Sequence, residues 1–274
     1  MARKFLLLCL TLCSLVQAAR AADMLVLGVV PYLSARKLAE LYEPMRAQLQ
    51  RSLGAPVVLE TAPDYQSYLA RTREGRYDII ATSPYFGRLA QLEQGYVPLA
   101  RPLTNLEPLL VTRMDGPHEL EALRGKVVST SDKLANLTLA AHRYLWQNGL
   151  EPGRDVTIRP AGSHANSVQA LLNGESAAAI ISVTTMRQLH PGTTARVRVM
   201  KRLPHITPLL YLVHRRLGAT RIDGLRGQLL QFANHTEVGR LFSKELGHDG
   251  LKEITPADMK VLDPYVQDLK VILR

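Results

Sequence analysis

The stretch APDYQSYLARTREGRYDIIATSPYF, residues 62–86, holds the clearest structural information in the chain. A second stretch, AGSHANSVQALLNGESAAAIISVTT, residues 161–185, matches it in residue type along its whole length without a gap. Each begins at an alanine, continues through a helical pattern that ends at a glycine, and closes with an apolar strand that ends in serine. Identity is low, so the general pattern of βαβ units could account for the match. The equal lengths instead favour two lobes built on one plan.

Strand and helix patterns alternate along the rest of the chain with short connections, which is typical of an α/β protein with mainly parallel sheets. In the first half, strands are predicted over 24–30, 57–62 and 77–83, and helices over 35–53, 64–74 and 84–94. In the second half, strands are predicted over 126–131, 155–161 and 177–183, and helices over 136–148 and 163–173. Most of these helices stop at a glycine, as helices commonly do.

Two further segments resemble each other and indicate how the lobes are connected. EPLLVTR (107–113) follows the first set of elements, and TPLLYLVHRR (207–216) follows the second. Each is predicted to be a strand that the chain enters just after crossing to the other lobe, so crossings are expected near 102–108 and 203–208. The expected domains are 23–106 for the first part of lobe 1, 107–205 for lobe 2, and 206–274 for a return to lobe 1 with C-terminal helices.

Residues 1–22 have the parts of a secretory signal peptide. Arg3 and Lys4 precede the apolar run 5–16, and Ala-Arg-Ala at 19–21 fits a cleavage site. The apolar run is too short to span a bilayer comfortably. We therefore expect a cleaved signal peptide and a secreted mature protein.

Cysteine content and charge exclude several classes of protein. Both cysteines, Cys9 and Cys13, lie inside the predicted signal peptide, so the mature protein would have no disulfide and no thiolate site. The chain has 34 Lys and Arg against 24 Asp and Glu, and without residues 1–22 the balance would be 31 against 24. No block of basic residues suggests a nucleic-acid partner. The modest positive excess favours a small anionic solute.

A binding site is predicted at the carboxyl ends of the strands, because ligands of open α/β sheets bind there, where helix amino ends converge. Hydroxyl, amide and histidine side chains follow the predicted strands, and such groups at helix starts suit an oxyanion. The candidate ligand-binding residues are Tyr32, Ser34, Tyr65, Ser83 and Tyr85 in the first lobe, and Ser131, His164, Asn166, Ser182 and Thr184 in the second.

Each of these residues also has a purely structural interpretation. A serine at a helix start is often only a cap, and His164 could serve as one. Tyr32, Tyr65 and Tyr85 could each be half-buried packing residues. Tyrosines at all three strand ends of one lobe favour a site, because a core would not need them there. We therefore expect Ser83 and Tyr85 to face a cleft between the lobes.

Catalytic and metal-binding patterns are absent from the sequence. It contains no H-E-x-x-H, no G-x-S-x-G, no P-loop and no G-x-G-x-x-G. The eight histidines are scattered without the spacing of a metal-binding pair. We expect no enzymatic activity, no cofactor and no metal.

An ordered set of short motifs resembles the phosphate/phosphite/phosphonate-type solute-binding proteins of ABC transporters. The first-lobe motifs are G-V-x-P at 28–31, a helix ending in Leu-Gly, then Asp-Tyr, and G-x-x-D before a strand that ends in a hydroxyl, a proline and an aromatic residue. LRGKVVSTS (123–131), the segment 149–182 and LPHITPLLYLV (203–213) resemble the second lobe and the return crossing. The resemblance covers nearly the whole mature chain.

The resemblance implies a type II periplasmic-binding-protein fold with two lobes that close on a solute. It also implies that Tyr85 faces the ligand and that His164 donates to the oxyanion. Phosphonate binders of this family hold the phosphoryl oxygens with Ser-Thr-Ser-Gly at the start of a second-lobe helix, whereas residues 134–138 here read Leu-Ala-Asn-Leu-Thr. Only Asn136 and Thr138 could donate from that segment. They join the candidate residues, and whether phosphonate itself binds stays open.

The leading hypothesis is a monomeric periplasmic protein that captures a small, oxyanionic solute for the permease of an ABC importer. The alternative is a sensory module with the same fold that docks on a membrane receptor kinase or cyclase. The sequence does not separate these two. An enzyme on this scaffold, such as one that makes a pyrimidine precursor, would need a nucleophile or a metal cluster in the cleft.

Overall fold

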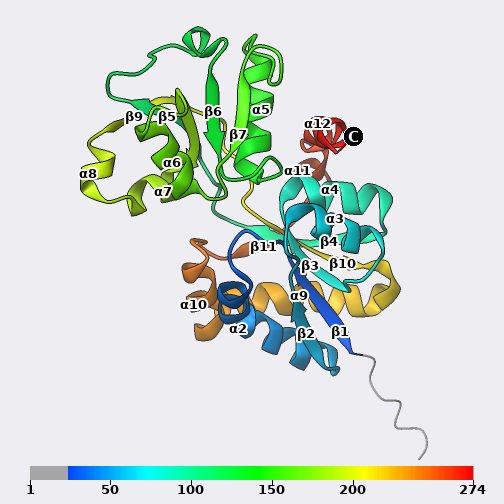
Figure 1. Ribbon diagram of the computed structural model, residues 1–274. Coiled ribbons are helices and arrows are strands. Elements are labelled where there is room, and N and C mark those ends of the chain that lie inside the picture. The colour runs from blue at the N-terminus through cyan, green and yellow to red at the C-terminus, as the bar shows by residue number, and fades with distance from the viewer. Residues whose placement is uncertain (1–23, 274) are drawn as a thin grey trace, which may run out of the picture.

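The computed structural model describes residues 24–273, which form two lobes, each a sheet flanked by helices (Figure 1). The two-lobed α/β fold expected from the sequence is confirmed. The predicted signal peptide, residues 1–22, lies outside the described residues. No helix within 24–273 combines the length and the hydropathy that a membrane crossing needs.

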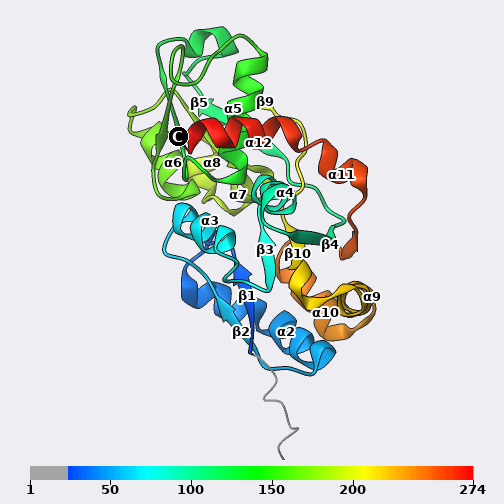
Figure 2. The same cartoon turned by 90° about the vertical axis from the view of Figure 1, so that its right-hand side faces the viewer.

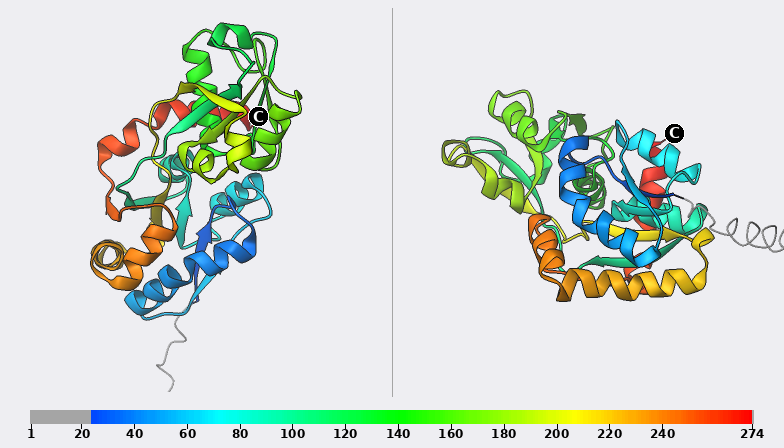
Figure 3. Two further views of the ribbon diagram at one scale, coloured as in Figure 1. Left: turned by 90° about the vertical axis from the view of Figure 1, so that its left-hand side faces the viewer. Right: turned by 90° about the horizontal axis from the view of Figure 1, so that it is seen from below.

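The first lobe has a six-stranded sheet in the order β11-β4-β10-β3-β1-β2. Its strands are β1 (Leu25–Val29), β2 (Val57–Glu60), β3 (Ile79–Thr82), β4 (Tyr96–Pro102), β10 (Leu210–His214) and β11 (Leu251–Glu253). Its helices are α2 (Ala35–Leu53), α3 (Tyr65–Arg73), α4 (Pro84–Glu93), the short η3 (Arg215–Leu217), α9 (Ala219–His235), α10 (Glu237–Glu245), α11 (Pro256–Lys260) and α12 (Asp263–Ile272). In Figure 3, α9 and α10 (yellow to orange) lie alongside α2 (blue).

The second lobe has a five-stranded sheet in the order β7-β6-β8-β5-β9. Its strands are β5 (Pro108–Arg113), β6 (Val127–Thr130), β7 (Thr157–Pro160), β8 (Ala178–Ser182) and β9 (Val197–Arg202). Its helices are the short η2 (Leu120–Leu123), α5 (Asn136–Gln147), α6 (His164–Leu172), α7 (Val183–Gln188) and α8 (Pro191–Thr194).

The two sheets repeat one plan. The order β2-β1-β3-β10-β4 in the first lobe corresponds to β7-β6-β8-β5-β9 in the second, so the matched stretches 62–86 and 161–185 form equivalent α3–β3 and α6–β8 units. Strands within the βαβ units are parallel. However, β10 runs antiparallel to β3, and β5 runs antiparallel to β8. Both sheets are therefore mixed, because each receives one strand that arrives from the other lobe.

The two segments that connect the lobes are hydrogen-bonded to each other. The amide N of Leu106 donates to the carbonyl O of Ile206 at 2.8 Å, and the N of Ile206 donates to the O of Leu106 at 2.9 Å. The side-chain amide of Asn136, at the start of α5, donates to the carbonyl O of Thr207 at 3.1 Å. A paired two-strand connection of this kind can bend while it keeps the lobes in register.

Local signals explain the helix boundaries around the lobe 1 sheet. Ser34 caps α2 by accepting from the Lys37 N, and the helix ends at Gly54, whose φ of +61° is left-handed. Gly28, in the middle of β1, has a different requirement. A Cβ there would lie 2.4 Å from Cγ of Tyr77, so only glycine lets the buried Tyr77 ring pack against the strand.

The C-terminal helix α12 contacts both lobes. Tyr265 stacks on Tyr85 of α4, with ring centroids 4.6 Å apart, and Asp268 pairs with Arg143 of α5 at 3.2 Å. Figure 2 shows α12 (red) lying across α4 and α5. The tail was expected to pack back on the first lobe. That expectation fits α9 and α10, whereas α12 also reaches the second lobe.

Candidate functional site

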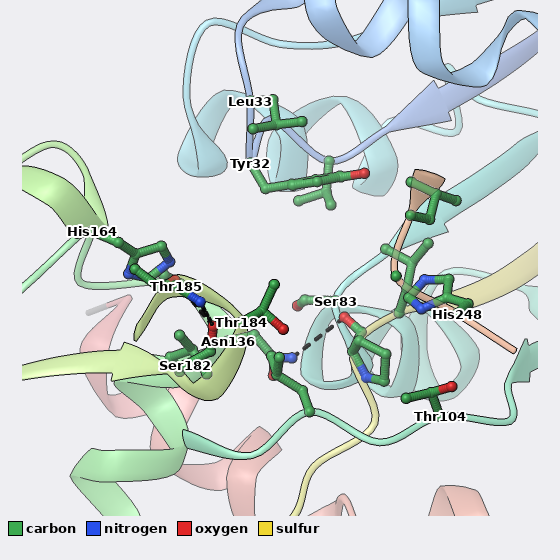
Figure 4. Close-up of a pocket in the computed structure, with 18 of the residues that line it drawn as sticks. Tyr32, Leu33, Ser83, Thr104, Asn136, His164, Ser182, Thr184, Thr185 and His248 are labelled. Carbon is green, nitrogen blue, oxygen red and sulfur yellow. Dashed lines mark hydrogen bonds between the residues drawn. The ribbon is translucent and has the colours of Figure 1, made fainter. Parts of the chain in front are cut away.

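A cavity of about 370 Å³ lies between the lobes, next to the two connecting segments (Figure 4). The first lobe contributes the end of β1, the start of α2, the start of α3, the start of α4 and the turn after α10. The second lobe contributes the amino ends of α5, α6 and α7. The carboxyl ends of the strands in both lobes therefore converge on one cavity, as the sequence predicts.

Seven of the twelve candidate residues line this cavity. They are Tyr32, Tyr65, Ser83, Asn136, His164, Ser182 and Thr184. They come from six separate helix starts or strand ends, so the strand-end rule located residues that are far apart in the chain.

Tyr85 does not face the cavity, and the prediction that it does is wrong. Its side chain is 1% exposed and stacks on Tyr265 of α12 with the two rings inclined by 15°. Ser83 is the cap of α4 and lines the cavity, whereas Tyr85 is the second helical residue after it. Successive helical residues point about 100° apart, which turns Tyr85 away from the strand end and toward α12.

The other four candidates also lie outside the cavity. Thr138 is 2% exposed and its hydroxyl is hydrogen-bonded to that of Thr130, so it belongs to the second-lobe core. Ser34 acts as the cap of α2. Asn166 uses its side-chain amide within the loop before α6, and Ser131 lies in the loop before α5. These four residues therefore have structural roles and do not line the cavity.

The amino end of α5 is open toward the cavity. Its cap position is Ala135, which has no side-chain oxygen, and no side chain caps the first turn. The next two residues, Asn136 and Leu137, line the cavity. Free N–H groups and the positive end of the helix dipole suit a bound oxyanion. The chain lacks the Ser-Thr-Ser-Gly side-chain donors of the phosphonate binders, but the backbone N–H groups at the start of α5 remain available to a ligand.

Two polar atoms of the second-lobe wall are buried without a hydrogen-bond partner among residues 24–273. They are Oδ1 of Asn136 and Nδ1 of His164, and both side chains line the cavity (Figure 4). Desolvation lowers the pKa of His164 below its ordinary value, so the ring is neutral at neutral pH. Buried polar atoms without partners cost free energy that a bound ligand can recover.

The cavity contains little formal charge. Neither lysine nor arginine occurs among its lining residues in the described part of the chain, and Glu245 is the one carboxylate there. Any oxyanion would therefore be held by neutral donors and helix ends rather than by ion pairs.

Two segments that line the cavity were not predicted from the sequence. Thr104 and Asn105 line it from the first connecting segment, and residues 245–248 line it from the turn after α10. Thr104 Oγ1 donates to Asp249 Oδ2 at 2.8 Å and accepts from the Asp249 N at 3.0 Å, which holds this turn against the connecting segment. A contact across 145 residues has no local sequence signal apart from the glycines of the turn.

His248, at the edge of the cavity, is expected to make stability depend on pH. Burial lowers the pKa of His248 to about 4. Between pH 6.5 and 4, the unfolded chain therefore binds a proton at this histidine more readily than the folded protein does. The contribution of His248 to the stability of the folded protein is complete above pH 6.5 and is lost as the pH falls toward 4. A shift of this size corresponds to about 3 kcal/mol. In urea denaturation, His248→Gln is expected to lose less stability between pH 7 and 4.5 than the wild type.

The control for this experiment is His118→Gln, since His118 is exposed. It should lose stability with acid as the wild type does. Equal losses for His248→Gln and the wild type would show that His248 does not carry the effect.

Two lobes joined by paired segments, with a cavity suited to an oxyanion between them, are the features of a solute-binding protein. The family model described as "ABC transporter, phosphonate, periplasmic substrate-binding protein" matches residues 27–259. The chain therefore belongs to this family of periplasmic substrate-binding proteins, which serve ABC importers and are not enzymes. No curated protein sequence matches the chain.

Solved structures share the fold at low sequence identity. XAC2383 from Xanthomonas citri, bound to ATP, is 19% identical with a TM-score of 0.79 over 91% of this chain and 98% of that one. PhnD1 from Prochlorococcus marinus, in complex with methylphosphonate, is 13% identical with a TM-score of 0.74 over 90% and 98%. The binding protein component of an ABC phosphonate transporter from Pseudomonas aeruginosa, PA3383, is 17% identical with a TM-score of 0.73 over 92% and 89%.

Proposed function

We propose that this substrate-binding protein captures a small oxyanion between its lobes and presents it to the permease of an ABC importer. The observation that carries this proposal is the uncapped start of α5, whose free N–H groups lie at the cavity beside the buried, unpartnered Nδ1 of His164. We further propose that residues 1–22 act as a cleaved signal peptide and that the mature protein works as a periplasmic monomer.

Binding would begin at the second lobe. The first-turn N–H groups of α5 would hold the oxyanion oxygens, with His164 and the hydroxyls of Ser182 and Thr184 nearby. Ser83, at the start of α4, would approach from the first lobe as the lobes close. The closed form is favoured only as far as the solute binds it more tightly than the open form, so contacts from both lobes are needed.

A thermal-shift screen of the mature protein is expected to detect the solute. The panel would contain phosphate, phosphite, alkyl- and arylphosphonates, sulfate and sulfonates. A ligand at 100 times its dissociation constant stabilises the folded protein by about 2.7 kcal/mol, which gives a clear shift of the melting temperature. His164→Ala is expected to lower the affinity about tenfold or more, because it removes a side chain whose buried Nδ1 would pair with the ligand.

His118→Ala is the matched control, since this exposed histidine lies outside the cavity. Its ligand affinity should equal that of the wild type. Silence across the whole panel, or equal affinities for the His164 and His118 variants, would count against the proposed oxyanion site.

A further inference from the structure

The two walls of the cavity differ in chemistry. Most residues that the second lobe contributes are polar, whereas the end of β1 and the start of α2 contribute Val30, Tyr32, Leu33 and Leu41. The turn after α10 adds Leu246. An oxyanion held at the start of α5 would therefore have an apolar wall opposite it.

Tyr32 offers this cavity the face of its ring rather than a free donor. Its hydroxyl donates to the hydroxyl of Tyr42 at 3.2 Å, which engages its one O–H group. In Figure 4 the Tyr32 ring and the Leu33 side chain lie on the first-lobe wall of the cavity. An aromatic face flanked by aliphatic side chains suits a flat or apolar group.

Tyr32 and Leu33 are also exposed to an unusual degree for large apolar residues at a cavity. Their exposed fractions are 38% and 43%, although the neighbouring Val30 and Leu41 are buried. Covering these two side chains with an apolar group would remove apolar surface from water, which favours binding. Apolar residues exposed at the mouth of a cavity commonly mark a ligand contact.

The size and charge of the cavity also favour an organic ligand over an inorganic anion. Its volume of about 370 Å³ lies in the range of sites for organic ligands, roughly 300 to 1,000 Å³. A tetrahedral inorganic oxyanion fills only the space of a few water molecules, at about 30 Å³ each. Glu245 is the one formally charged side chain among the described lining residues, so an anionic head group has no cationic partner and contacts of a substituent would have to add to the binding.

We propose that the solute is an organic oxyanion, a phosphonate or phosphate monoester that carries an apolar, flat substituent. The head group lies at the start of α5, and the substituent lies against Tyr32 and Leu33. This inference rests on the proposed function, because it assumes that the oxyanion binds at the second-lobe wall. It adds that the first lobe selects the substituent.

Isothermal titration with inorganic phosphate, methylphosphonate and phenylphosphonate tests the inference. The two phosphonates share one head group and differ only in the substituent, and phosphate carries a fourth oxygen in its place. Phenylphosphonate is expected to bind at least about tenfold more tightly than methylphosphonate, since its ring buries additional apolar surface. Leu33→Ala is expected to weaken phenylphosphonate about three- to tenfold and to leave methylphosphonate unchanged. Leu33 is 43% exposed, so the substitution spares the core.

Leu92→Ala is the matched control, because Leu92 is 52% exposed on α4 and does not line the cavity. It should leave the affinity for all three anions unchanged. The inference is overturned if methylphosphonate binds as tightly as phenylphosphonate, or if Leu33→Ala weakens both equally. Absence of binding by all three anions is a different result, which would also overturn the inference, whereas the proposed function is overturned only if sulfate, sulfonates and phosphite are silent as well.

Discussion

Gly239→Ala is expected to unfold the first lobe at temperatures where the wild type is stable. A Cβ at position 239 would lie 1.8 Å from the carbonyl O of Phe232 and 2.5 Å from its carbonyl carbon. Both are backbone atoms at the end of α9, so the clash cannot be relieved by a side-chain rotation. The helices α9 and α10 would have to separate, which would disrupt the packing of Phe232 and Phe242 in the core. We expect a loss of more than about 3 kcal/mol.

Gly227→Ala is the matched control for this substitution. Gly227 lies inside α9, and a Cβ there would meet no atom within 4 Å. Alanine at such a helical position should stabilise the protein by about 0.5 to 1 kcal/mol. Urea denaturation of both variants provides the comparison. A Gly239→Ala protein as stable as the wild type would show that α9 and α10 do not pack as closely as described.

Tyr85→Ala is the second substitution with a large expected effect. Tyr85 is 1% exposed and stacks on Tyr265, so alanine would leave a large cavity between α4 and α12. The expected loss is about 3 to 5 kcal/mol in the free energy of unfolding. The same change should loosen α12, which can be followed as faster amide hydrogen exchange over residues 263–272.

Tyr85→Phe separates packing from ligand binding at the same position. The hydroxyl of Tyr85 is buried and has no hydrogen-bond partner among residues 24–273. Removing it should keep or slightly raise stability, because an unsatisfied buried group disappears. The affinity of the Tyr85→Phe variant for anions should equal that of the wild type. A stable Tyr85→Phe variant with weakened binding would show that Tyr85 reaches the solute after all.

The sequence predicted most of the fold because the relevant signals are local. Helix caps such as Ser34 and helix ends such as Gly54 act within a few residues, and the repeat at 62–86 and 161–185 exposes the shared plan of the lobes. By contrast, β11 has three residues and pairs with β4 across about 150 positions. No local pattern indicates such a strand. The same reason explains why the contact of α12 with α5 was not expected.

The sequence predicted which strand ends and helix starts form the candidate site, but not which residue of each faces the cavity. The strand-end rule found Ser83, His164 and Ser182, because the carboxyl ends of parallel strands must meet at one edge of the sheet. It could not separate Ser83 from Tyr85, since which of two neighbouring residues faces the cavity depends on the exact helix start. It also could not find residues 245–248, which reach the cavity through the packing of α10 against α2 and the hydrogen bonds between Thr104 and Asp249.

The exchange of strands between the lobes has a consequence for the order of folding. All strands of the second lobe come from one continuous segment, 108–202, so its sheet can be completed from that segment alone. The first lobe cannot do the same, because β10 lies between β3 and β4 in its sheet and arrives only at residue 210. Pairings between residues so distant in the chain form slowly, since a long loop must first be closed. We therefore expect the second lobe to fold as a unit of its own and the first lobe to complete its sheet last, after the chain has returned through both connections.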